Sequence, residues 1–71
     1  MDREPVASEV LRSVGYDPDT RVLEVELAGG AVYRYLDVPA HVHATLMTAP
    51  SHGQFYVDGI RNGGYEYVQV D

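Results

Sequence analysis

The sequence predicts a single small α+β domain in which strands come first and helices follow. The chain has 71 residues, which is the length of one domain. Apolar residues alternate with a period of two in the first half, whereas helical spacing appears only after residue 37. This segregation is typical of the α+β class. We expect a three-stranded antiparallel meander, then a helix and a second short helix, with a short C-terminal strand as an open alternative.

The start of the chain has the weakest pattern. Residues 1–7 are polar, contain Pro5 and show no periodicity, so they are predicted to form a flexible arm before a domain over residues 8–71. The segment Ser8–Tyr16 fits neither period cleanly. Its β-branched residues and the turn that follows favour a strand, and a helix remains the alternative.

The clearest strand follows a turn. Asp17-Pro18-Asp19-Thr20 has the residues of a type I turn, with an acid first and proline second. The segment Arg21–Leu27 then alternates strictly, as a half-buried strand does. Residues 31–36 alternate again after Ala28-Gly29-Gly30, so the two segments are predicted to form a hairpin.

The loop length decides the register of this hairpin. A two-residue glycine turn would place Arg34 opposite Val25, among aliphatic side chains. A three-residue loop, with its last glycine in a left-handed conformation, pairs Val25 with Tyr33 and sets Glu24 opposite Arg34. The second register gives one apolar face and one charged face, as a sheet covered on one side requires. We therefore expect the three-residue loop.

Helical signals fill the second half. Val38-Pro39 opens a helix, because proline is accepted at the first helical position, and the helix should end before Pro50. Ser51-His52-Gly53-Gln54 matches a capping box, which predicts a second short helix. Asn62-Gly63-Gly64 should end that helix, and residues 65–70 alternate as a short strand does.

Composition excludes several classes of function. Eleven acidic residues against five arginines and no lysine give a net charge of −6, which disfavours nucleic acid and anionic membranes as partners. No cysteine is present to hold zinc or form a disulfide. No apolar run reaches the roughly 20 residues of a membrane span, and Met1–Pro5 lacks a signal-peptide pattern. We expect a cytoplasmic protein without a cofactor.

An ordered set of short motifs resembles the KTSC domain in its stand-alone form, over roughly residues 6–67. The motifs are Gly15-Tyr16-Asp17, Leu23-x-Val25-x-Leu27, Gly30, Tyr33-x-Tyr35, Val38-Pro39, Ser51-x-Gly53, Phe55-Tyr56 and Ile60-Arg61. That family is named for a segment at the C-terminus of some lysyl-tRNA synthetases and also occurs as short bacterial and phage proteins. The resemblance implies no established activity. Attachment to a synthetase suggests RNA binding, from which this chain departs by having no lysine and a negative charge.

Six residues are candidates for a binding surface: Arg34, Tyr33, Tyr35, His52, Gly53 and Arg61. The tyrosines could stack on bases beside the guanidinium of Arg34, but a small core needs large side chains, so packing under the helix is the favoured interpretation. The arginines, Arg12 included, could contact anions. Ordinary surface ion pairs with acids such as Glu24 or Glu66 are the simpler role.

Catalytic and metal sites are not expected. His41 and His43 are two residues apart, so they do not share a helix face, whereas metal-binding pairs use spacings of three or four. Ser51 beside His52, with Asp58 nearby, is better explained by helix capping than by nucleophilic catalysis. The sequence predicts a non-catalytic interaction domain whose partner is a protein or a second copy, bound through an exposed strand edge. The alternative is a module that binds RNA or single-stranded DNA.

Overall fold

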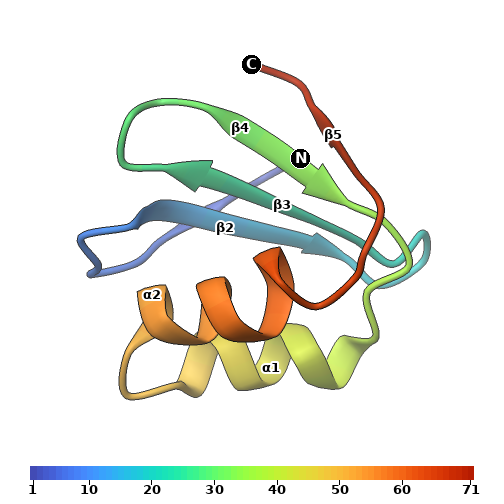
Figure 1. Ribbon diagram of the computed structural model, residues 1–71. Helices are drawn as coiled ribbons and strands as arrows, with labels where there is room; N and C mark the ends of the chain where they lie inside the picture. Colours follow the sequence, from blue (N-terminus) through green and yellow to red (C-terminus); the bar gives the residue numbers. More distant parts are fainter.

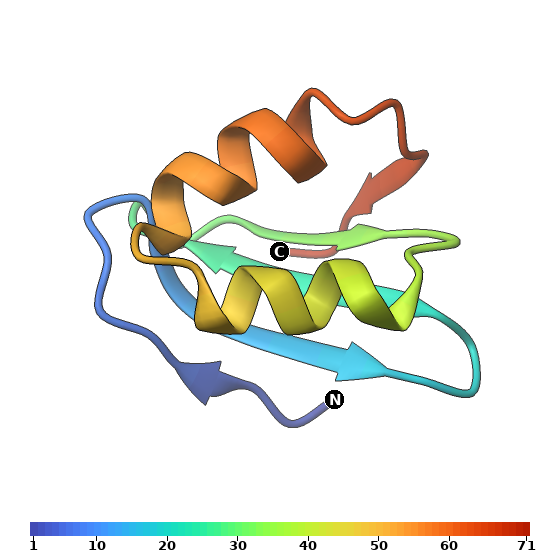
Figure 2. The same ribbon diagram turned by 90° about the horizontal axis from the view of Figure 1, so that it is seen from below.

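The computed structural model describes residues 1–71 as a five-stranded antiparallel sheet whose strands lie side by side in chain order, β1-β2-β3-β4-β5. Both helical segments pack against the same face of this sheet (Figures 1 and 2). The elements are β1 Glu4–Pro5, β2 Leu11–Asp17, β3 Val22–Leu27, β4 Val32–Tyr35, α1 Ala40–Thr48, α2 His52–Phe55, η1 Tyr56–Arg61 and β5 Tyr67–Gln69. The predicted α+β class is confirmed, and no helix is long and apolar enough to cross a membrane.

The predicted meander is present as β2-β3-β4, but the sheet is larger than three strands. The C-terminal strand forms and pairs with β4, and the segment Ser8–Tyr16 contains strand β2 rather than a helix. A fifth strand, β1, pairs with β2 through Glu4 and Pro5. Both β1 residues are exposed, so neither alternation nor apolar content marks this strand in the sequence.

The first residues lie on the sheet, although the sequence predicts a flexible arm there. Asp2 and Arg3 cross over Gly15, where a Cβ atom would come within 2.5 Å of the Asp2 carbonyl oxygen. The Val6 N–H donates to the Arg12 carbonyl at 3.1 Å. Position 15 therefore needs glycine to let the N-terminal segment approach. The division between an arm at residues 1–7 and a domain at 8–71 stays a prediction.

The hairpin has the predicted register. Val25 pairs with Tyr33, and Glu24 pairs with Arg34. Gly30 has a φ of 99°, the left-handed conformation that the three-residue loop requires. Leu27 closes the loop, since its N–H donates to the Ala31 carbonyl at 2.8 Å.

The turn between β2 and β3 is one residue longer than predicted. The Asp17 carboxylate accepts the Asp19 N–H at 2.9 Å, and this backbone hydrogen bond holds the pKa of Asp17 below its ordinary value. The Arg21 N–H donates to the Asp17 carbonyl at 2.7 Å, with a φ of 59° at Arg21. Arg21 therefore belongs to the turn, and the strand begins at Val22.

The helices follow the predicted boundaries closely. Pro39 is the N-cap of α1 rather than its first helical residue, and the helix ends before Pro50. The second helix starts at His52 and passes directly into the π-helical turn η1, which ends at Arg61, just before the predicted break.

Ser51 caps the second helix as predicted, but the capping box is half formed. The Gln54 N–H donates to the Ser51 hydroxyl at 3.2 Å. The Gln54 side chain does not reach back to the cap and instead donates to the Asp58 carboxylate at 2.7 Å. The hydroxyl of Ser51 is therefore the part of the motif that stabilises the helix start.

Replacing Ser51 by alanine is expected to lower the free energy of unfolding by about 0.5–2 kcal/mol, because one amide of the first helical turn loses its acceptor. Chemical denaturation measures the loss. Ser51→Asp is the matched control, since it restores an acceptor and should recover most of the stability. An unchanged midpoint for the alanine variant would show that the cap contributes nothing.

A single core lies between the helices and the sheet. Its buried residues come from β2, β3, β4, the connection before α1, α1 and η1: Leu11, Val14, Leu23, Val25, Tyr35, Val38, Leu46, Tyr56 and Ile60. Tyr35 is buried as predicted, whereas Tyr33 is only half-buried and lies at the edge of this core. Tyr33 also lines a cleft at this edge of the core.

Candidate functional site

A cleft lined mainly by tyrosines lies between the C-terminal end of η1 and strands β4 and β5. Its volume is about 300 Å³, at the lower end of the range for ligand sites, so it fits one side chain or one small ring. We call it the tyrosine cleft. Its lining residues are Leu27, Tyr33, Tyr35, Tyr56, Arg61, Asn62 and Tyr67.

Three of the tyrosine rings touch at one wall of the cleft. The ring centroid of Tyr67, on β5, lies 5.7 Å from that of Tyr33 and 5.5 Å from that of Tyr35, both on β4. Register places them together, because Tyr67 pairs with Tyr35 across the two strands. These distances are typical of aromatic pairs, which stabilise each other beyond the area that they bury.

Two of the tyrosines that line the cleft share a hydrogen bond between their hydroxyls. The Tyr35 and Tyr56 oxygens are 2.7 Å apart, and both residues are buried. Burial and this hydrogen bond raise the pKa of Tyr56 far above its ordinary value, so the Tyr56 phenol stays neutral. Two hydroxyls have two protons, and the bond between them uses only one. The pair therefore has one O–H left to donate.

Arg61 supplies the positive charge of the cleft. It is the last residue of η1, it is exposed, and it forms no salt bridge with any carboxylate of the chain. Asn62 follows it on the same rim. None of the lining residues is acidic. The cleft thus combines apolar ring faces with hydrogen-bond donors and one unpaired guanidinium.

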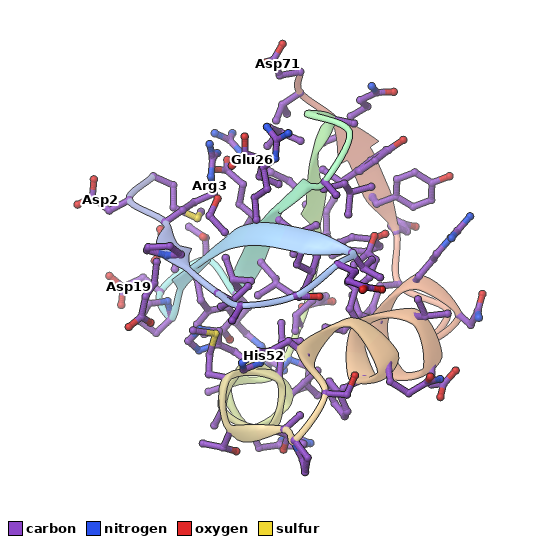
Figure 3. The ribbon with its side chains drawn as sticks, turned by 90° about the vertical axis from the view of Figure 1, so that its left-hand side faces the viewer. Asp2, Arg3, Asp19, Glu26, His52 and Asp71 are labelled. Carbon is purple, nitrogen blue, oxygen red and sulfur yellow. The ribbon has the colours of Figure 1, made fainter.

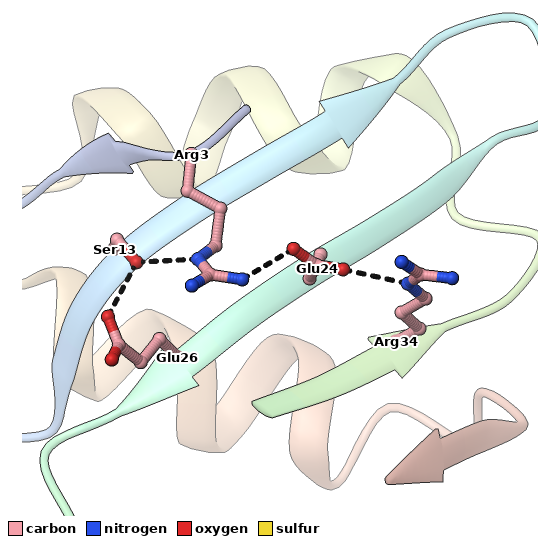
Figure 4. Close-up of polar contacts among 5 residues, drawn as sticks. All are labelled: Arg3, Ser13, Glu24, Glu26 and Arg34. Carbon is pink, nitrogen blue, oxygen red and sulfur yellow. Dashed lines mark hydrogen bonds and ion pairs between the residues drawn. The ribbon is translucent and has the colours of Figure 1, made fainter. Parts of the chain in front are cut away.

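Arg34 lies elsewhere, on the face of the sheet that the helices leave open (Figure 4). Its Nε atom donates to Glu24 Oε1 at 2.7 Å, and Arg3 Nη1 donates to Glu24 Oε2 at 2.6 Å. The chain of contacts continues from Arg3 through Ser13 to Glu26. Glu24 is only 3% exposed. The predicted pair between Arg34 and Glu24 is confirmed. The Arg34 guanidinium is therefore already paired within the chain.

His52 and Gly53 lie at the start of α2, outside the tyrosine cleft. His52 Nδ1 is 2.8 Å from the Leu46 carbonyl oxygen, and Gly53 is buried against Ser8 and Val10. Figure 3 shows His52 beside the helices and Arg3 on the opposite side of the sheet. Both α2 residues have packing roles, so the structure divides the six predicted binding residues. It brings together only Tyr33, Tyr35 and Arg61.

Sequence reasoning missed four residues of the cleft: Leu27, Tyr56, Asn62 and Tyr67. A usable signal was present for Tyr67, because the final strand alternates and its helix-side position faces the other tyrosines once it pairs with β4. No local pattern marks Tyr56, whose place in the cleft depends on how η1 packs.

The two histidines of α1 do not line the tyrosine cleft. His43 stacks on Tyr16 with ring centroids 4.7 Å apart, and burial lowers the pKa of His43 below its ordinary value. His41 is exposed on the same helix. No three His, Asp or Glu side chains gather as a metal site would require, and the cleft contains no nucleophile paired with a base. The arrangement is suited to binding.

The outer edge of β5 adjoins the tyrosine cleft and has free backbone groups. The Leu36 N–H donates to Glu66 and the Val70 N–H donates to Val32, so the even-numbered residues of this segment face β4. In an antiparallel ladder the alternate residues point away, which leaves the N–H and C=O groups of Tyr67 and Gln69 on the open edge.

This edge is also apolar, which distinguishes it from the other edge of the sheet. Tyr67, Val68 and Val70 are 59%, 48% and 44% exposed. Strand β1, at the opposite edge, contains Glu4 and Pro5, a charge and a proline that prevent further strand pairing. Only β5 therefore presents an edge that another strand could extend.

Fold and cleft together define a small α+β domain, with an antiparallel sheet that is covered on one face and open at one edge. The sequence matches the model of the KTSC domain over residues 7–67, and the chain belongs to the KTSC domain family. The expected resemblance is confirmed. This family is not a known catalytic family.

The chain is similar along its whole length to stand-alone proteins. It is 41% identical to an uncharacterized protein of Stutzerimonas stutzeri over 71 residues, which covers all of both chains. The crystal structure of a KTSC domain protein from Yersinia pestis is 39% identical, with a TM-score of 0.88 over 99% of this chain and 97% of the other. A lysine–tRNA ligase from a Nostoc species is 35% identical over 60 residues, but the chain spans only 10% of that enzyme.

Proposed function

We propose that this chain is a non-catalytic protein-binding domain that adds an extended segment of its partner to the free edge of β5. The observation that carries the proposal is the unprotected edge of β5, where Tyr67 and Gln69 direct their backbone groups outward beside exposed Tyr67, Val68 and Val70 side chains. Strand addition obtains affinity from main-chain hydrogen bonds and specificity from pockets for alternate side chains. The tyrosine cleft is such a pocket.

Charge restricts the partner. The domain has a net charge of −6, and Glu66 and Asp71 flank β5 on either side. A neutral or basic segment therefore associates more readily than an acidic one. A second copy of the chain has the same negative charge and is the less favoured occupant of the edge.

Replacing Gln69 by proline is expected to weaken peptide binding at least about tenfold, because the outward N–H disappears and the ring blocks the edge. Peptides are first selected from a random library, and their affinities for both proteins are then measured by fluorescence polarisation. Gln69→Thr is the matched control and should bind normally. The inward bonds of β5 to β4 do not use the Gln69 N–H, so the fold should persist.

Equal binding by the proline variant would exclude the β5 edge as the site. Size-exclusion chromatography with light scattering tests the second copy as occupant. A stable dimer that Gln69→Pro converts to a monomer would assign the edge to self-association.

Nucleic acid is a second candidate, favoured by the tyrosine rings and the unpaired Arg61 in one cleft. Stacking on such rings stabilises single strands by about 1–3 kcal/mol per base. Against it, Arg34 lies on the other face of the sheet, paired with Glu24, and Arg61 is the only guanidinium in the cleft that could contact phosphate. We therefore rank protein above nucleic acid as the partner.

We expect no binding to generic RNA or single-stranded DNA tighter than roughly 10 μM at physiological salt. Each phosphate contact contributes a salt slope of only about −0.7, and eleven acidic residues in a chain of 71 repel phosphate over a Debye length of about 10 Å. Fluorescence anisotropy with labelled oligonucleotides measures this. Sub-micromolar binding that Arg61→Ala abolishes would replace the protein-binding proposal with a nucleic-acid one.

A further inference from the structure

The tyrosine cleft contains donors without any charged acceptor. Arg61 has no carboxylate partner, the Tyr35–Tyr56 pair has one unused O–H, and Asn62 lies on the rim. No lining side chain is acidic, although acids outnumber arginines by eleven to five in the chain. A ligand that matches these groups contributes an anion or a strong acceptor.

The size and walls of the cleft restrict the rest of the ligand. A volume of about 300 Å³ accommodates one side chain or one base. Tyrosine rings and Leu27 form much of the lining, so the group that enters is apolar or aromatic. The ligand therefore combines one apolar group with one anion close beside it.

The position of the cleft beside the open edge of β5 favours one class of such ligands. Tyr67 belongs both to the cleft and to the open edge of β5, so a segment paired with that edge places every second side chain on the helix side, where the cleft opens. A chain terminus is the place where a peptide has an apolar side chain and a carboxylate on the same residue. The net charge of −6 repels a polyphosphate chain but tolerates one carboxylate on a neutral or basic peptide.

We infer that the tyrosine cleft binds the C-terminal residue of an extended partner, with its apolar or aromatic side chain against the tyrosines and its carboxylate on Arg61. This inference rests on the proposed addition of a strand to β5. The carboxylate is planar and accepts two parallel hydrogen bonds from a guanidinium, which explains an arginine at this rim. Recognition of a peptide terminus would make the domain selective for proteins with a particular last residue.

A peptide library displayed with free C-termini tests the inference. We expect enrichment of an apolar or aromatic residue at the last position. The best peptide is then synthesised as the free acid and as the C-terminal amide, and the free acid should bind at least tenfold more tightly. Arg61→Gln should abolish this preference, whereas Arg12→Gln, at an exposed arginine of β2 outside the cleft, should retain it.

Two results would overturn the inference: a library without enrichment at the last position, or equal binding of acid and amide. In either case the proposed function stands if Gln69→Pro weakens peptide binding at least about tenfold, and it falls with the inference if that variant binds normally. Adenosine monophosphate serves as a third probe. If it binds the wild type as tightly as the peptide and competes with it, the cleft is a nucleotide site and the inference is wrong.

Discussion

Replacing Glu24 by glutamine is expected to lower the free energy of unfolding by about 2–3 kcal/mol, more than any other single substitution proposed for this domain. Glu24 is 3% exposed and accepts a hydrogen bond from Arg3 and another from Arg34. Glutamine keeps the size but loses the charge that both arginines contact. The arginine side chains remain 28% and 44% exposed, which keeps the loss below that of a fully buried pair. Thermal unfolding should shift by roughly 10–20 °C.

The dependence on pH gives this prediction a second measurement. Burial alone raises the pKa of Glu24, but hydrogen bonds from Arg34 and Arg3 outweigh it, so the pKa lies below its ordinary value of 4.5. The stabilisation is therefore complete above pH 4.5 and is lost as the pH falls through the lowered pKa. The gap between wild type and Glu24→Gln should narrow in acid. Glu26→Gln, on the same strand and face, is the control and should cost less than about 1 kcal/mol.

Replacing Tyr56 by phenylalanine is expected to cost about 1–3 kcal/mol, because the buried Tyr35 hydroxyl loses its partner. Tyr35→Phe should cost a similar amount for the same reason. The double variant removes both polar groups and should be no less stable than either single variant, since no buried hydroxyl remains unpaired. Chemical denaturation of the four proteins measures the coupling. Additive losses would show that the hydroxyls do not act as a pair.

The meander could be predicted because its local patterns agree with its packing. Strict alternation over residues 21–27 marked the apolar face, and only the three-residue loop kept Arg34 off that face. Ser51 and Pro50 likewise mark the boundary between the helices through chemistry that depends on nearby backbone alone.

Strand β1 could not be predicted, because its pairing depends on a neighbour distant in sequence. Glu4 and Pro5 are exposed and have no strand pattern of their own. What holds the segment is Gly15, which leaves room for the crossing chain, and Glu24, which binds Arg3. Gly15 and Glu24 each fitted a local pattern of the sequence, and neither pattern indicated a contact with the N-terminal segment.

The candidate site was predicted only in part for the same reason. Tyr33 and Arg61 were chosen as separate surface candidates, and packing of η1 against β4 brings them to one cleft. Arg34 was chosen for its neighbours in sequence, but alternation along β4 sends it to the opposite face. Residue type therefore identified several members of the cleft, and only the tertiary fold could select among them.

The most direct test of the central claim is a nuclear magnetic resonance titration of the ¹⁵N-labelled domain with a peptide selected by binding. The account predicts that the Tyr67 and Gln69 amides shift most and become protected from hydrogen exchange, because they point outward and receive the added strand. The Glu4 amide, on the opposite edge of the sheet, should not change. Shifts centred on β1 or on the Arg3–Glu24–Arg34 face, with the Tyr67 and Gln69 amides unaffected, would contradict the account.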